Sequence, residues 1–166
     1  MMKYLKLVAV VLAGLIPVGA HAERVVTVNF STAILTITDK GQAVMRTAVV
    51  LPKGNYYPVP VSGTVSRSVM GPTWTPTANM HRDRPGRYRQ SYGPYQTGNA
   101  MGHCKVSINF DRSDASLRYV RIHGNARQQD LGQRLSRSCI RIPDSLCQEL
   151  VNATAGRNNV RVQFVR

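Results

Sequence analysis

Short runs of β-branched residues constrain the fold of this chain more than any other feature of its sequence. Residues 25–30 and 33–38 are rich in Val, Ile and Thr, and the turn residues 39–41 lead into a third apolar run at 43–51. This spacing is typical of sequential antiparallel strands. Three later runs predict further strands, at residues 105–110, 117–122 and 159–165. The pattern indicates a mostly β fold.

One short helix is expected near the C-terminus. Residues 145–154 place Leu146, Leu150 and Val151 at helical spacing, so these side chains should face the core. Asp144 is a candidate cap for the start of this helix, and Gly156 is a candidate for its end.

The segment from Pro52 to Gly102 has weak periodicity and contains most of the prolines and tyrosines. Long irregular segments in compact domains are often binding loops or lids. Aromatic rings offer apolar area with a polar tip, so they suit a groove, although packing of the loop onto the sheet explains any one ring equally well. The candidate rings are Tyr56, Tyr57, Trp74, Tyr88, Tyr92 and Tyr95.

The N-terminus resembles a secretory signal. Two lysines precede the apolar residues 7–18, and a small-residue exit ends at Ala22. The apolar run is too short to cross a bilayer comfortably. We therefore expect residues 1–22 to be a signal peptide cut after Ala22, and residues 23–166 to form one periplasmic or secreted domain without stable membrane insertion.

The charge of the chain is strongly positive. Loss of the two signal lysines leaves 20 basic against 8 acidic residues, a net charge of +12. Phosphates attract such an excess, but the expected export and the scattered arginines argue against nucleic acid as a partner. An anionic extracytoplasmic polymer or a carboxylate-rich substrate fits better, and a solvated basic surface explains most of the arginines equally well.

Three cysteines in an oxidising compartment leave at least one without an internal partner. If Cys104 pairs with Cys147, Cys139 remains free, but the sequence does not decide the connectivity. Zinc is a weaker alternative because no Cys-x-x-Cys or His-x-x-x-His spacing occurs. His103 and Cys104, as strand neighbours, would also point to opposite faces. No metal is expected.

His123 and Cys139 are candidates for a base and a nucleophile. His123 ends a predicted strand at Gly124, where a side chain can reach a cleft, and imidazole titrates near neutrality. A thiol becomes a useful nucleophile only beside positive charge or a base, which Arg137, Arg141 or His123 could supply. On these residues alone, structural roles remain open for both side chains.

Four segments in order carry a resemblance to a known family. His123-Gly124 and Ser136-Arg137-Ser138-Cys139-Ile140-Arg141 resemble the signature of the L,D-transpeptidase catalytic domain (YkuD-type), which is a His-Gly pair, a loop and Ser-x-Gly-Cys-(Ile/Val)-Arg. Residues 72–77 are similar to its Thr-Pro-rich segment, and residues 98–102 to its Asn-Pro-Leu-Gly turn. Order and spacing agree from about residue 24 to the C-terminus.

The resemblance implies an L,D-transpeptidase-like β-sandwich with one short helix after the cysteine motif and a long irregular loop region over a groove. It further implies that Cys139 attacks a peptidoglycan tetrapeptide stem and releases D-alanine, while His123 manages the proton. A second stem or water would resolve the thioester, giving a 3-3 crosslink or carboxypeptidase action. No cofactor is needed, and carbapenem β-lactams would inhibit the enzyme by acylating the cysteine.

The resemblance also implies roles for the surrounding residues. The amides of Ser138 and Cys139 would stabilise the oxyanion, and the Gly124 carbonyl would orient the imidazole. Substrate contacts would come from Arg141, Arg137, Trp74 and Tyr92.

Two residues depart from the family pattern at the cysteine. Ser138 replaces the usual glycine, and Arg137 replaces a position that is often histidine. A serine narrows the allowed backbone angles and adds bulk beside the substrate. The alternative to an active enzyme is therefore an impaired wall-binding or host-contact module on the same scaffold.

Overall fold

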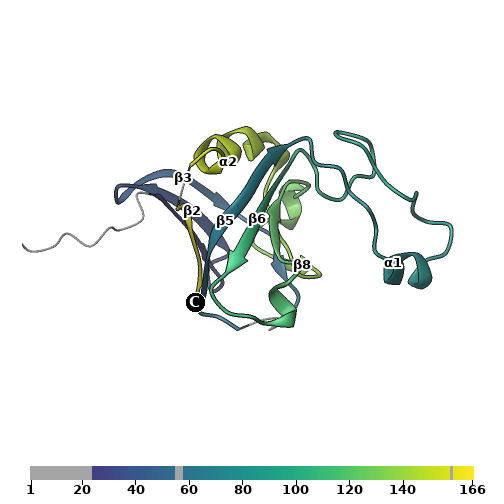
Figure 1. Cartoon of the computed structure of the whole chain (residues 1–166), viewed down its shortest axis with the longest axis horizontal. Helices are drawn as coiled ribbons and strands as arrows, with labels where there is room; N and C mark the ends of the chain where they lie inside the picture. Colours follow the sequence, from purple (N-terminus) through teal and green to yellow (C-terminus); the bar gives the residue numbers. More distant parts are fainter. Residues whose placement is uncertain (1–23, 55–57, 158) are drawn as a thin grey trace, which may run out of the picture.

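The computed structural model describes residues 24–166 except 55–57 and 158 (Figure 1). The expected signal segment and two of the candidate aromatic residues, Tyr56 and Tyr57, lie outside the described residues. The strands are β1 (Arg24–Asn29), β2 (Ile34–Asp39), β3 (Gln42–Ala48), β4 (Leu51–Pro52), β5 (Val61–Met70), β6 (Cys104–Phe110), β7 (Arg121–His123), β8 (Arg134–Ser136), β9 (Ile140–Arg141) and β10 (Arg161–Val165). The helices are α1 (Ala78–Asp83) and α2 (Cys147–Thr154), with 3-10 turns η1 (Ala115–Leu117), η2 (Gln128–Asp130) and η3 (Asp144–Leu146).

Eight of the strands form one curled mixed sheet in the order β3-β2-β1-β10-β5-β6-β7-β9, and β4 and β8 form a small parallel pair. The mostly β class is confirmed, and the expected sandwich takes the specific form of this single curved sheet with a two-stranded companion. β1 and β10 pair in parallel, so the first and last strands of the described chain lie side by side at the centre of the sheet (Figure 1). The strands that carry the His-Gly and Cys-Ile-Arg motifs, β7 and β9, lie together at one edge.

The first three strands follow the β-branched pattern closely. β1 pairs antiparallel with β2, and β2 with β3. The turn between β2 and β3 needs left-handed backbone, which Lys40 and Gly41 supply with φ of 49° and 83°. These three strands and their antiparallel order confirm the sequence prediction.

The hydrophobic core combines buried side chains of the sheet with those of α2. Alternate residues of β1 and β2 are fully buried, because successive strand side chains point to opposite faces. α2 contributes Leu150 and Val151, as predicted, and it packs against β5 and β6. A disulfide between Cys104 at the start of β6 and Cys147 at the start of α2 fixes the helix to the sheet.

Three details differ from the sequence prediction. Residues 117–122 were expected as one strand, but η1 and a turn occupy most of this range, and only residues 121–123 form β7. The predicted irregular segment 52–102 contains β5, the longest strand, between β10 and β6. This strand was not predicted because it contains many Ser, Thr and Gly residues and because its partner strands are distant in sequence.

The third difference concerns Asp144. It does not cap the helix through its side chain; the capping positions of η3 and α2 are Pro143 and Leu146, which make no side-chain cap bond. The carboxylate of Asp144 instead accepts hydrogen bonds from the amides of His103 and Asn125, because the chain brings those two loops against it.

Residues 71–103 form an arm that leaves the sheet between β5 and β6. Figure 1 shows it reaching away from the strands, with α1 towards its far end. Asn99, buried at the base of the arm, donates to the carbonyls of Pro72 and Gly93 at 2.8 and 2.9 Å and accepts from the amide of Met101. One side chain therefore joins the Thr-Pro segment to the turn at residues 98–102.

Candidate active site

The sheet places His123 at the end of one strand and Cys139 just before its parallel neighbour. His123 is the last residue of β7, and Cys139 directly precedes β9; the register pairs Ile122 with Ile140 and His123 with Arg141. The two isoleucines are fully buried. The strand pleat therefore directs His123, Cys139 and Arg141 to the opposite face.

Cys139 is the free thiol of this site, since the other two cysteines form the disulfide. Its Sγ lies 3.5 Å from the carbonyl oxygen of Tyr119 and 3.9 Å from Oγ of Ser138. Burial raises the pKa of the thiol, while the amide of Arg121 and the hydroxyl of Ser138 partly oppose that shift. The resting thiol is therefore neutral at pH 7.

His123 is buried, with only 4% of its surface exposed. Burial lowers its pKa to about 4, although the nearby carbonyls of Gly124 and Met101 favour the protonated form. Its Nδ1 is buried without a hydrogen-bond partner among the described residues. Within the same residues, thiol and imidazole make no direct hydrogen bond, so the resting pair is neutral and separate.

A tight turn presents the cysteine. Ser136 is buried and donates its hydroxyl to the carbonyl of Cys139 at 2.5 Å, which closes residues 136–139 into a loop. Ser138 is not among the described residues that adopt a left-handed φ. Its backbone conformation therefore does not require a glycine. In the described chain, the amides of Ser138 and Cys139 donate none of the turn and loop hydrogen bonds. Both amides are therefore available as donors.

Gly124 is required by close approach rather than by its backbone angles. A Cβ at this position would overlap Oδ1 of Asp144 and stand 3.0 Å from Sγ of Cys147. Any larger residue after His123 would push η3 and the disulfide away from the strand end.

Arg141 is half-buried beside the thiol, and Arg137 is exposed. Burial lowers the pKa of Arg141, and the charges of Asp130 and Cys139 partly compensate. Nε of Arg141 is buried without a partner among the described atoms, so the guanidinium retains capacity to bind an anion.

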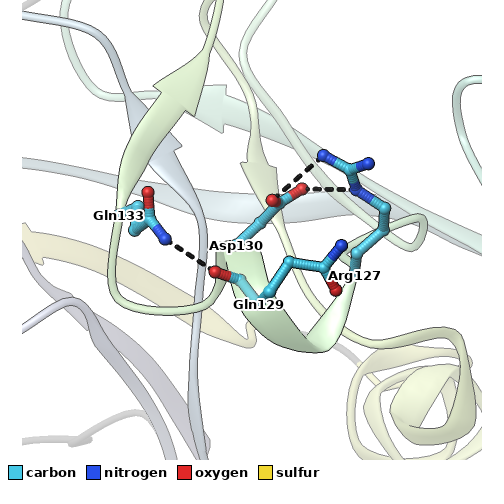
Figure 2. A network of polar contacts seen from close by, with 4 residues as sticks. All are labelled: Arg127, Gln129, Asp130 and Gln133. Carbon is cyan, nitrogen blue, oxygen red and sulfur yellow. Dashed lines mark hydrogen bonds and ion pairs between the residues drawn. The ribbon is translucent and has the colours of Figure 1, made fainter.

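A polar network supports the loop between the two motifs. Figure 2 shows Asp130, which is buried, held by Arg127 through Nε at 2.9 Å and Nη2 at 3.1 Å. Gln133 also donates to the carbonyl of Gln129 at 2.6 Å. Asp130 was not predicted as a site residue from the sequence, and the structure identifies it as the carboxylate whose charge stabilises the cation of Arg141.

Trp74 and Tyr92 contact each other on the arm. Their backbones exchange two hydrogen bonds of 2.9 and 2.8 Å, and their rings lie 5.2 Å apart. Tyr88 adds an edge contact to Trp74. Tyr92 is buried, so its ring stabilises the arm; the described contacts of this aromatic group lie within the arm and do not include Cys139.

A cleft of about 190 Å³ opens where the arm meets the His-Gly turn. Tyr95 and His103, whose rings lie 5.3 Å apart, line it together with Asn125 and Asp144. Tyr119, Arg121 and Asp144 are further residues of the site that were not predicted from the sequence, because their positions depend on long-range contacts. Of these three residues, only Asp144 had a signal in the sequence, which is its position five residues after Cys139.

The described residues contain no cluster of three His, Cys, Asp or Glu side chains that could hold a metal ion. No helix in the described part of the chain has both the length and the apolar character needed to cross a membrane.

Comparison with known proteins identifies the family. The model of the "L,D-transpeptidase catalytic domain" family matches residues 23–162. The chain belongs to this family. The probable L,D-transpeptidase YbiS of Escherichia coli K12 is 32% identical over 127 residues, which cover 72% of this chain and 38% of YbiS. The chain thus spans well under half the length of that L,D-transpeptidase.

Solved structures of the L,D-transpeptidase family share this fold. An L,D-transpeptidase from Mycobacterium smegmatis aligns with a TM-score of 0.61 at 11% identity, covering 87% of this chain and 59% of that one. The catalytic domain of the E. faecium L,D-transpeptidase acylated by ertapenem aligns with a TM-score of 0.59 at 16% identity, covering 88% and 99%. LdtMt1 in complex with imipenem aligns with a TM-score of 0.59 at 14% identity, covering 86% and 59%.

Alkylation of Cys139 should depend steeply on pH. Because burial raises the thiol pKa, the thiolate fraction should rise about tenfold per pH unit between roughly pH 6 and pH 9. We expect the rate of modification by iodoacetamide, followed by mass spectrometry, to rise throughout this range. The variant Cys139→Ala supplies the background. A plateau near pH 7 would instead indicate a preformed thiolate–imidazolium pair.

Proposed function

We propose that this chain is an exported, cysteine-dependent L,D-transpeptidase that crosslinks peptidoglycan tetrapeptide stems through a thioester on Cys139. One observation carries the proposal. The free thiol of Cys139 directly precedes β9, which pairs in parallel with the strand that ends in His123. The half-buried Arg141 lies on the same strand, and its positive charge favours the thiolate form of Cys139.

The proposed reaction has two steps. Sγ of Cys139 attacks the carbonyl between the L-centre of the diamino acid and the terminal D-alanine, and the thiol proton passes to Nδ1 of His123. Collapse of the tetrahedral intermediate expels D-alanine, whose amine takes that proton. The side-chain amine of a second stem then attacks the thioester, which forms the 3-3 crosslink and restores the thiol.

Two features of the resting site leave His123 free to accept a proton. The unpartnered Nδ1 of His123 can accept a proton, and a neutral imidazole is ready to do so at pH 7. The thiol must first turn from the carbonyl of Tyr119 towards the imidazole. Catalytic hydrogen bonds often tighten in this way when substrate binds.

The turn around Cys139 supports stabilisation of the oxyanion. The free amides of Ser138 and Cys139 are the candidate donors, and each such donor contributes about 3 kcal/mol in other acyl transferases. Arg141 and the exposed Arg137 are the candidates for binding a stem carboxylate.

The test is covalent trapping by a carbapenem, which the acylated E. faecium domain makes a suitable probe. The mature chain is incubated with ertapenem and digested, and the peptide containing Cys139 is weighed by mass spectrometry. We expect one adduct on that peptide, and none in Cys139→Ala. A folded wild-type chain that forms no adduct contradicts the proposal.

Digestion of peptidoglycan treated with the protein distinguishes the possible products. Transpeptidation yields 3-3 dimers, whereas carboxypeptidase action yields tripeptide stems without dimers. The export expected from residues 1–22 is tested by sequencing the N-terminus of the secreted protein, which should begin at Glu23.

A second candidate function is a wall-binding module without catalysis. Ser138 favours it, because the hydroxyl lies 3.9 Å from Sγ where the family has only a glycine hydrogen. This module would retain binding to peptidoglycan in Cys139→Ala and would form no carbapenem adduct.

A further inference from the structure

A single carboxylate joins the loops around His123. Oδ1 of Asp144 accepts hydrogen bonds from the amide of His103 at 2.8 Å and from the amide of Asn125 at 2.9 Å. It lies between Gly102 and Gly124, where a Cβ on either glycine would overlap this oxygen. The carboxylate therefore occupies a cradle formed by the two loops.

The cradle adjoins His123 along the chain and across the strand ladder. Gly124 follows the histidine directly, and its amide donates to the carbonyl of Cys104. His103 precedes β6, whose Lys105 pairs with His123 across the ladder. Fixing the two cradle loops therefore fixes the main chain that carries the imidazole.

The disulfide holds Asp144 in this cradle. Cys147 lies three residues after Asp144, and its Sγ is 3.9 Å from Oδ1. Its partner Cys104 adjoins His103. The bond thus connects the element that supplies the carboxylate to the strand that receives it.

The charges facing His123 have opposite effects. Arg141 on β9 disfavours protonation of the imidazole, and Asp144 on η3 favours it. Lys105 is the cation across the ladder on β6, and Cys139 carries a neutral thiol. Asp144 is therefore the nearby negative charge that acts on the imidazole.

We propose that Asp144 is a positioning residue for His123: it fixes the main chain that follows the histidine and the start of the strand paired with it, and it supplies negative charge when the imidazole takes the thiol proton. The catalytic part of this inference rests on the proposed function. The part that concerns the position and charge of the imidazole does not.

Two substitutions separate the effects. Asp144→Asn keeps an Oδ1 that can accept both hydrogen bonds and removes the charge, whereas Asp144→Ala removes both. Asn29→Ala is the matched control, because Oδ1 of Asn29 also accepts two amides, those of Ser31 and Thr32, in the turn between β1 and β2.

Three quantities are measured for each variant: the rate of acylation by ertapenem, the Tm, and the NMR titration of His123. We expect Asp144→Ala to slow acylation roughly 100-fold and Asp144→Asn roughly tenfold. Asp144→Asn should keep a Tm close to that of the wild type and should lower the titration midpoint of His123. Asn29→Ala should lower Tm without changing acylation or the titration.

The inference is overturned if Asp144→Asn leaves both acylation and the His123 midpoint unchanged, even when Asp144→Ala fails to fold. It is also overturned if Asn29→Ala slows acylation as much as an Asp144 variant that loses the same amount of Tm. Absence of acylation in the wild type would defeat the proposed function alone, because the NMR titration still decides whether Asp144 acts on His123.

Discussion

Replacement of His123 by glutamine is expected to slow carbapenem acylation of Cys139 by roughly 100- to 10,000-fold, the range that a general base contributes. Glutamine retains polar atoms of similar reach but accepts no proton at neutral pH. The rate is measured by mass spectrometry over time. A decrease of less than about threefold would show that another group takes the thiol proton.

The same substitution should change the acid stability of the protein. Because the pKa of folded His123 is about 4, below its ordinary value of 6.5, the unfolded chain binds the proton first as pH falls. The free energy of unfolding of the wild type should therefore decrease by about 3 kcal/mol between pH 6.5 and pH 4. In His123→Gln this part of the decrease should be absent.

Urea unfolding at several pH values measures the effect. The carboxyl groups of Asp39, Asp111 and Asp114 have pKa values below 3.8, so their contribution to stability is lost only below about pH 4. They should not obscure the window of His123. Equal acid destabilisation of the wild type and His123→Gln would contradict the buried neutral histidine.

Loss of the Cys104–Cys147 disulfide is expected to lower the free energy of unfolding by about 4 kcal/mol. The two cysteines are separated by 43 residues, and a cross-link of that span removes considerable entropy from the unfolded chain. Urea unfolding of Cys104→Ser/Cys147→Ser is compared with that of the wild type, both without reductant. A difference below about 1 kcal/mol would contradict the expectation.

The disulfide should also affect reactivity, because His123 and Cys139 both lie within the span that it closes. We expect the double variant to acylate more slowly even when it remains folded. Addition of reductant should slow the wild type and leave the double variant unchanged, which controls for effects of the reductant on the carbapenem.

Ser138, which departs from the family pattern, affects the pKa of the neutral thiol. Ser138 tolerates its backbone position, and its hydroxyl is one of the groups that lower the pKa of the thiol. A serine at this position therefore has an electrostatic effect that a glycine lacks. Replacement by glycine, the family residue, would separate this effect from crowding of the substrate.

The sequence alone determined the features that depend on local patterns. Alternating β-branched residues predicted β1, β2 and β3, because the period of two is set by the geometry of a strand. Apolar spacing predicted α2, because helix geometry sets a different period of about 3.6 residues. The order of the His-Gly and Cys-Ile-Arg motifs identified His123 and Cys139 as the candidate base and nucleophile.

Only the tertiary structure decided how these residues meet. β5 escaped prediction because its neighbours, β10 and β6, come from distant parts of the chain. The pairing of Cys104 with Cys147 and the seat of Asp144 between two glycines depend likewise on contacts over 19 to 43 residues. The neutral states of thiol and imidazole follow from burial, which is a property of the packed chain and of no local pattern.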